Sequence, residues 1–152
     1  MKTTENRGSI LVVDDDPAVL VLVQSILTSV GYRPLLAATG EDALHLAQQK
    51  HIHMDLALLD IRMPGLHGPQ LANQILAVRP NIRILFMSGF VEEEMIRIKA
   101  LDRNAHFLPK PFKSAGLLQA IEETLQAEPS KPFEDHELEG MHAMAAAATQ
   151  LQ

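Results

Sequence analysis

Five polar side chains follow short apolar runs of this sequence, and their types suit the binding of a divalent cation and a phosphoryl group. They are Asp14, Asp15, Asp60, Ser88 and Lys110. Three carboxylates cannot all stay ionised side by side without a cation, so either a pKa rises or a metal ion neutralises them. Mg²⁺ suits such a cluster because it prefers carboxylates together with waters and a phosphate oxygen. None of the seven His residues follows one of these runs, so a zinc-type site is not expected.

Ser88 and Lys110 extend the cluster toward phosphate chemistry. Ser88 supplies a small hydroxyl donor, and Lys110 supplies a point charge suited to a phosphoryl group. Taken singly, each has an ordinary explanation, since Ser-Gly is a common turn and Lys beside Pro is a common surface pattern. Taken together, a cation site, a carboxylate, a hydroxyl and an ammonium meet the requirements of phosphoryl transfer to a carboxylate.

The elements that would position these groups are buried strands of a parallel sheet. The run Leu56–Asp60 is apolar up to its last residue and a Pro64-Gly65 turn follows it, which is typical of a strand covered on both faces. Asp60 then lies at the carboxyl end of that strand, where open α/β sheets place their ligand crevices.

Strand and helix patterns alternate along the chain. We expect strands at 10–13, 32–38, 56–60, 82–87 and 105–108. A helix follows each strand; Asp16 before Pro17 caps the first, and a capping box at Thr39 opens the second. Pro34 inside the second strand suits an edge position. This alternation predicts an α/β fold in which helices cover both faces of a five-stranded parallel sheet.

Composition narrows the class of protein. The chain has 152 residues, a formal net charge of −6 and no Cys, so disulfides and thiolate metal sites are excluded. The negative charge argues against direct nucleic-acid binding, and no apolar run is long enough for a membrane span. We expect a cytoplasmic protein with a lead-in at 1–8, one domain at 9–127, and a tail at 128–152 that is disordered or a marginal helix.

Over roughly residues 9–126 the sequence resembles the response-regulator receiver domains of two-component signalling. The motifs that carry the resemblance occur in the family's order and at compatible spacing. They are Val12-Val13-Asp14-Asp15-Asp16-Pro17, Leu58-Leu59-Asp60-Ile61-Arg62-Met63-Pro64-Gly65, Met87-Ser88-Gly89 and Leu108-Pro109-Lys110-Pro111-Phe112. The resemblance implies a flavodoxin-like, doubly wound sheet with strand order 2-1-3-4-5 and five helices.

The resemblance also implies roles for the acidic residues. Asp60 matches the phosphoacceptor, which takes a phosphoryl group from a phosphohistidine on a kinase. Asp15 matches the carboxylate that binds Mg²⁺ directly, and Asp14 matches its neighbour, which acts largely through water. The backbone carbonyl of Arg62 matches a further protein ligand of the metal. Such a protein catalyses only its own phosphorylation and dephosphorylation and is otherwise not an enzyme.

Three more residues match the switch that such domains use. Ser88 matches the hydroxyl that turns toward the phosphoryl oxygen, and Lys110 matches the lysine that contacts it. Phe107 matches the aromatic switch position; as Phe it lacks the hydroxyl that a Tyr would offer. The Lys110–Pro111 peptide bond is expected to be cis, which X-Pro bonds permit at modest cost. We also expect the side chains of Arg62 and Phe90 to flank the site and to affect dephosphorylation.

The expected partners are a histidine kinase or a phosphotransfer domain. A downstream protein or a second copy would use the face formed by the fourth helix, the fifth strand and the fifth helix. Both a single-domain regulator and a receiver excised from a hybrid kinase fit the sequence. Two other functions are alternatives to this one. One is a small phosphatase with an aspartyl-phosphate intermediate, against which Pro17 argues because it follows Asp16 where a Gly would be expected. The other is a docking module that no longer accepts phosphate.

Overall fold

A computed structural model of the chain describes residues 7–66, 68–89, 92–102 and 104–134. Strands and helices alternate throughout this part, as the sequence predicts. In chain order the elements are β1 (Gly8–Val13), α1 (Pro17–Ser29), β2 (Tyr32–Ala37), α2 (Gly40–Ala47), β3 (Leu56–Asp60), α3 (Gly68–Val78), β4 (Arg83–Ser88), α4 (Glu92–Leu101), β5 (His106–Pro109) and α5 (Ser114–Gln126). None of the helices in the described ranges is long and apolar enough to cross a membrane.

The five strands form one parallel sheet in the order β2-β1-β3-β4-β5, which confirms the predicted fold class. β2 lies at one edge, and Pro34 is paired in register with Ile10 of β1. An edge strand tolerates this proline because one side of its backbone has no ladder to complete. β3 lies at the centre, between β1 and β4.

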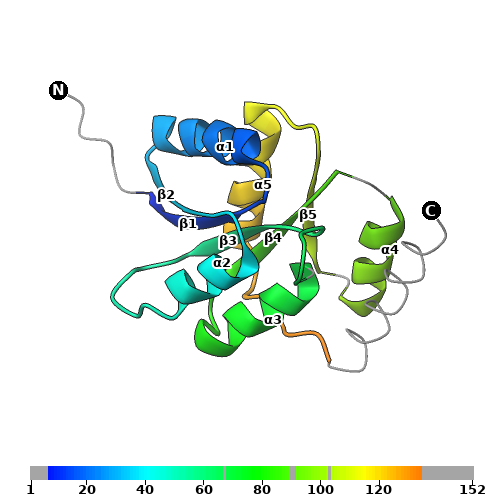
Figure 1. The fold of residues 1–152 in the computed structure, drawn as a ribbon. Helices are drawn as coiled ribbons and strands as arrows, with labels where there is room; N and C mark the ends of the chain where they lie inside the picture. The colour runs from blue at the N-terminus through cyan, green and yellow to red at the C-terminus, as the bar shows by residue number, and fades with distance from the viewer. Residues whose placement is uncertain (1–6, 67, 90–91, 103, 135–152) are drawn as a thin grey trace.

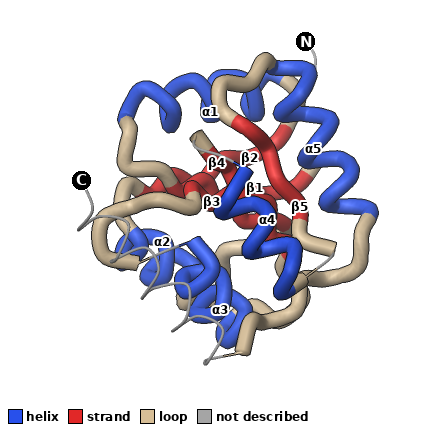
Figure 2. The backbone as a smooth tube through the Cα atoms, turned by 90° about the vertical axis from the view of Figure 1, so that its right-hand side faces the viewer, coloured by secondary structure: helices blue, strands red, loops and turns tan. Residues whose placement is uncertain are grey.

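Helices cover both faces of the sheet, with α1 and α5 on one face and α2 and α3 on the other (Figures 1 and 2). Alternate residues of β3 therefore enter different cores: Leu56 and Leu58 pack with the α1 and α5 residues, and Ala57 and Leu59 pack with those of α2 and α3. This two-sided burial accounts for the unbroken apolar run in the sequence, since a strand covered on both faces has no solvent side.

Local signals fix where the first helices begin. The Asp16 side chain accepts a hydrogen bond from the backbone N–H of Ala18 at 2.9 Å, and Pro17 occupies the first helical position. The Thr39 hydroxyl accepts from the N–H of Asp42 at 3.0 Å and caps α2. Both caps confirm the sequence prediction, because each satisfies an N–H group that has no partner within its helix.

The chain continues past α5 and crosses from the α5 face of the sheet to α3 (Figure 1). Phe133, near the end of this segment, is only 8% exposed and belongs to the core beneath α2 and α3. The division of the chain at 127/128 stays a prediction. The stretches 1–6 and 135–152, which include most of the expected lead-in and tail, lie outside the described residues.

Candidate functional site

Four of the predicted site residues meet at the carboxyl edge of the sheet. Asp14 follows β1 directly, Asp60 and Ser88 are the last residues of β3 and β4, and Lys110 follows β5. Between β1 and β3 the strand order changes direction, since β2 lies outside β1 and the remaining strands lie beyond β3. Such a switch point leaves a crevice at the strand ends, because the connections on its two sides run to opposite faces.

Asp14, Asp15 and Asp60 form a compact acidic cluster in this crevice. One carboxylate oxygen from each lies within 4.8 Å of the others. Asp14 is fully buried and Asp60 is 6% exposed, whereas Asp15 is exposed. One oxygen of Asp14 accepts a hydrogen bond from the backbone N–H of Asp16 at 2.9 Å, which fixes that carboxylate. A cluster of hard oxygens with one exposed member fits Mg²⁺, which retains several of its waters.

Lys110 connects two of these carboxylates. Its ammonium nitrogen lies 2.5 Å from Oδ2 of Asp14 and 3.5 Å from Oδ2 of Asp60. The backbone N–H of Lys110 donates to the carbonyl oxygen of Ser88 at 2.7 Å, which ties the residue to the end of β4. The Lys110–Pro111 peptide bond is cis. The arrangement places one positive charge between two carboxylates that would otherwise repel each other.

The pKa of Asp60 reflects this environment. Burial and, after it, the charge of Asp14 raise the pKa to about 6, against the opposing effects of the Lys110 charge and of hydrogen bonds from Arg62 and Lys110. For Lys110, burial alone would lower the pKa, but its interactions with Asp14 and Asp60 outweigh burial and raise it. Lys110 therefore remains an ammonium, and Asp60 is mostly ionised at pH 7.

The loop after β3 brings Arg62 next to the acidic cluster. The backbone N–H of Arg62 points toward Oδ1 of Asp60 at 3.4 Å, and the Arg62 residue itself is exposed. The predicted role of its carbonyl oxygen as a metal ligand stays a prediction. Phe90, the other residue expected to flank the site, lies outside the described ranges.

Two glycines shape this loop, and one of them was not singled out by sequence reasoning. Gly65 has a φ of +91°, a backbone conformation that favours glycine. Gly68 lies so close to the end of β3 that an added Cβ would be 2.9 Å from the Cα of Ile61 and 3.2 Å from the carbonyl oxygen of Asp60. Gly68 thus allows α3 to begin against the backbone that carries Asp60.

Ser88 and Phe107 lie on the same face of the sheet. Phe107 is paired in register with Phe86, and their rings stack with centroids 5.8 Å apart. Ser88 is two residues beyond Phe86 on β4, so its side chain projects to the same side. Ser88 is 4% exposed, and Phe107 is half-buried beneath the ammonium of Lys99, which lies 5.8 Å from the ring centroid.

Comparisons with known proteins agree with this geometry. Residues 10–122 match the family model of the response regulator receiver domain. The chain is 33% identical over 127 residues to the sensor kinase CckA of Brucella abortus, covering 82% of this chain and 13% of that protein. It is 32% identical over 117 residues to sporulation initiation phosphotransferase F of Bacillus subtilis, covering 76% of this chain and 92% of that one.

A solved structure resembles the chain to a similar degree. It is the crystal structure of the CheX-CheY-BeF3-Mg²⁺ complex from Borrelia burgdorferi, with a TM-score of 0.70 and 27% sequence identity. The match covers 79% of this chain and 90% of that one. The chain thus spans nearly all of two of these proteins and a small part of the sensor kinase.

Proposed function

The chain belongs to the response regulator receiver domain family, the phosphoacceptor domains of two-component signalling, and we propose that it accepts a phosphoryl group on Asp60. The observation that carries this assignment is the close approach of Asp14, Asp15 and Asp60, with Lys110 between two of them. This arrangement lies at the point of the sheet where the strand order reverses, and it gathers every group that the transfer needs.

In the proposed reaction, Asp60 is the nucleophile. A carboxylate oxygen of Asp60 forms a bond to phosphorus, the bond from phosphorus to the donor's imidazole nitrogen breaks, and the electron pair leaves with the imidazole. The product is an acyl phosphate. With its pKa at about 6, raised mainly by burial, Asp60 still carries the charge that this attack requires at neutral pH.

We propose that Asp14, Asp15, Asp60 and the carbonyl of Arg62 would hold a Mg²⁺ ion. When bound, that ion would offset negative charge on the transferring phosphoryl group. The chain's own cation, Lys110, lies within reach of Asp60 and would contact the phosphoryl oxygens as the charge develops. Asp14 holds the Lys110 ammonium in place through the 2.5 Å contact between them.

Ser88 and Phe107 would convert this chemistry into a change of shape. Ser88 ends β4 next to the strand that carries Asp60, so its hydroxyl can reach a phosphoryl oxygen after a rotation about one side-chain bond. Phe107 lies one pleat away on the same face and would respond to the space that the hydroxyl leaves. New contacts at Ser88 would then favour one of two arrangements of α4 and β5.

The proposed partners follow from the same chemistry. The phosphoryl donor would be a histidine kinase or a phosphotransfer domain. The downstream partner, or a second copy, would bind the face made by α4, β5 and α5. The likeness to a CheY seen in complex with CheX supports output through protein contact. The cytoplasmic location and the absence of direct nucleic-acid binding stay predictions. The proposal fits both a chain that acts alone and a receiver that is part of a larger kinase.

Mass spectrometry after incubation with acetyl phosphate and Mg²⁺ tests the assignment. The wild-type chain should gain one phosphoryl group, and Asp60→Asn should not. Asp42→Asn, an exposed carboxylate at the start of α2, is the matched control and should be phosphorylated like the wild type. A gain that persists in Asp60→Asn would place the acceptor elsewhere, and no gain in the wild type would favour a docking module.

The phosphatase alternative makes a different prediction. It requires repeated turnover of a phosphate ester, with a nucleophile after β1 rather than at the end of β3. We propose that the chain catalyses only its own phosphorylation and dephosphorylation. An assay with a generic aryl phosphate in excess should therefore show essentially no product release, whereas sustained turnover of the ester would contradict the proposal.

A further inference from the structure

The segment 127–134, which we call the strap, connects the two faces of the sheet. It begins at the end of α5 and reaches α3, whose residue Asn73 is 60 positions earlier in the chain than Phe133 (Figure 1). Two hydrogen bonds hold its first half. Arg83 donates from Nε to the carbonyl oxygen of Ala127 at 3.2 Å, and the backbone N–H of Ile84 donates to the hydroxyl of Ser130 at 3.0 Å.

Asn73 of α3 binds the backbone of Phe133 through both ends of its side-chain amide. Its nitrogen donates to the carbonyl oxygen of Phe133 at 2.6 Å, and its oxygen accepts from the N–H of the same residue at 2.7 Å. A paired contact of this kind recognises a peptide backbone in one orientation, because an amide offers a donor and an acceptor side by side. The side chain of Asn73 thus acts as a peptide-binding group.

The side chain of Phe133 completes the core beneath α3. It belongs to the same core cluster as Ala72, Leu76, Ile84 and Phe86, against which Ala105 also packs. The rings of Phe133 and Phe86 have centroids 6.4 Å apart and planes tilted by 51°. Withdrawal of the strap would therefore expose an apolar pocket that the folded domain cannot fill by itself.

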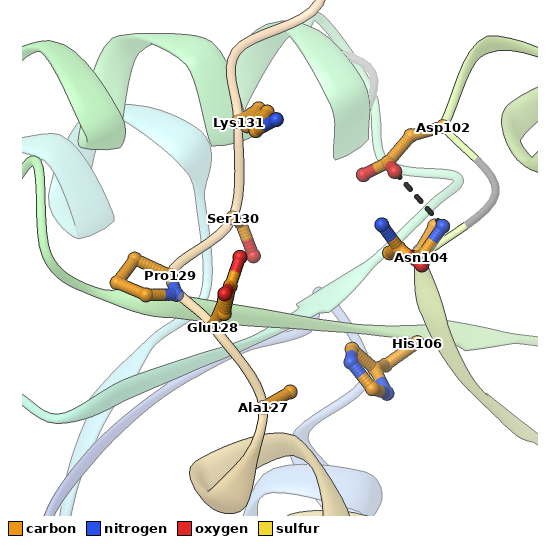
Figure 3. Close-up of a pocket in the computed structure, with 9 residues that line it drawn as sticks. Asp102, Asn104, His106, Ala127, Glu128, Pro129, Ser130 and Lys131 are labelled. Atoms are coloured by element: carbon orange, nitrogen blue, oxygen red, sulfur yellow. Dashed lines mark hydrogen bonds between the residues drawn. The ribbon is translucent and has the colours of Figure 1, made fainter.

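The strap is held at its anchors and not along its whole length. A cavity of about 420 Å³ separates residues 127–131 from the segment that leads into β5 (Figure 3). Asp102 and Asn104, which precede this strand, and His106, its first residue, line the cavity on that side. Its lining is rich in charged and polar groups, so water can enter it. A segment bound at separate points over a polar cavity can detach without unfolding the sheet, since this cavity lies between it and the residues that lead into β5.

The pocket of Phe133 adjoins the residues proposed to switch. Phe86 touches Phe133 on one side and stacks on Phe107 on the other. Phe86 is 2% exposed, so it cannot move away from one neighbour without disturbing the other. Ser88 follows two residues later on the same face of β4. A continuous row of side chains therefore leads from the phosphorylation site to the strap.

We propose that the pocket between α3 and β4, which holds the Phe133 ring, is a peptide-binding site occupied by the chain's own strap. The occupancy of this pocket is coupled to the position of Phe107. The occupant is residues 130–133, recognised through the Phe133 ring and backbone. Through Ser88 and Phe107 the coupling extends to phosphorylation of Asp60, and that part rests on the proposed function. Because coupling between two sites is reciprocal, the state of the strap also changes the equilibrium between the two arrangements of the switch residues. The lifetime of the acyl phosphate changes with it, since the two arrangements surround the phosphoryl group differently.

Hydrogen exchange tests the docked state directly. In Phe133→Ala and Asn73→Ala, the amide of Ile84 should exchange at least about tenfold faster than in the wild type, because Ser130 no longer holds it. Glu128→Ala, an exposed residue of the same strap that lies outside residues 130–133, is the matched control and should leave exchange unchanged. The amide resonance of Phe107 should also shift in both test variants and not in the control. Both tests work without phosphorylation.

The link to the phosphorylation site is tested on the same full-length samples with acetyl phosphate and Mg²⁺. We expect the acyl-phosphate lifetime to differ at least about fivefold between Phe133→Ala and Glu128→Ala. Thermal melts before the measurement establish that each variant is folded, and Asn73→Ala serves if Phe133→Ala is not. Lifetimes within about twofold, in samples whose mass shows phosphorylation, would overturn the coupling.

Failure of the proposed function gives a different pattern. If Asp60 accepts no phosphoryl group, no sample gains mass, while the exchange of Ile84 and the resonance of Phe107 still decide whether the strap is docked and coupled. Unchanged exchange at Ile84 in both test variants would overturn the docking itself. An unshifted Phe107 resonance would overturn its link to the switch.

Discussion

The ammonium of Lys110 lies 2.5 Å from a carboxylate oxygen of Asp14, although the two residues are 96 positions apart in the chain. The Asp14 side chain has no exposed surface, and its carboxylate oxygens are held by this contact and by the N–H of Asp16. A divalent cation bound by the acidic cluster would share Asp14 with Lys110. With the cation bound, two positive groups would therefore compete for one carboxylate.

Replacement of Lys110 by Met should raise the affinity for Mg²⁺ by about tenfold, because it removes a positive charge next to the metal site. The metal-free variant should also be less stable than the wild type, by about 3 kcal/mol, since the buried carboxylate of Asp14 loses the partner of its ion pair. Isothermal titration calorimetry at fixed ionic strength measures the affinity. Lys113→Met, an exposed neighbour, is the control. Unchanged or weaker Mg²⁺ binding in Lys110→Met would refute the competition.

The stability of the metal-free protein should depend on pH through Asp60. Burial and the charge of Asp14 raise the pKa of Asp60 to about 6 in the folded protein, above its ordinary value of 3.8. The folded state then holds the proton more tightly, so the contribution is fully present below about pH 4 and is lost as pH rises through 6.

Asp60→Asn has no proton to lose, and between pH 4.5 and 7.5 it should lose about 2 kcal/mol less stability than the wild type. Urea unfolding with a chelator present at each pH measures the difference between the two proteins, which removes the effect of other titrating groups. Parallel curves for both proteins would mean that Asp60 has an ordinary pKa. Addition of Mg²⁺ at pH 7.5 should restore the wild type's lost stability.

Gly68→Ala should slow phosphorylation by acetyl phosphate by about tenfold. The added methyl group would press on the Cα of Ile61 and the carbonyl oxygen of Asp60, so the backbone that carries the acceptor must shift. Gly116→Ala is the control, because a Cβ at this position in α5 meets nothing within 4 Å. That control should gain about 0.5 to 1 kcal/mol of stability, as alanine favours a helix over glycine. Equal phosphorylation rates in both variants would show that the loop absorbs the methyl group.

Arg62→Ala should shorten the lifetime of the acyl phosphate by about threefold. Arg62 is exposed and its backbone N–H points toward Asp60, and we propose that its side chain shields the phosphoryl group from water. The decay is followed by mass spectrometry after removal of acetyl phosphate. Arg33→Ala, an exposed arginine on the edge strand β2, controls for the loss of charge. Equal lifetimes would discard a shielding role for Arg62.

Much of the site could be read from the sequence because its residues follow strands. In a parallel sheet the carboxyl ends of all strands lie on one edge, so Asp14, Asp60 and Lys110 had to converge once the strands were assigned. Their types then restricted the chemistry. The buried runs were also clear, since β3 is apolar on both faces. These inferences need only local patterns and one rule of topology.

The features that escaped sequence reasoning depend on contacts between distant segments. Phe133 follows a Pro-containing stretch with no helical or strand period, and nothing local indicates that it fills a pocket beneath α3. Asn73 reads as one polar residue on a helix, yet it binds a backbone 60 positions away. Gly68 likewise reads as a turn residue, because its close approach to Ile61 arises only when α3 is docked.

Because Phe133 fills a gap in the core, the end of α5 is a poor place to join this domain to another protein. A chimera fused at Ala127 would leave an apolar pocket exposed to solvent, and two such molecules could bury this surface by associating with each other. Fusions that retain the chain through Glu134 would keep the Phe133 side chain, which fills this pocket.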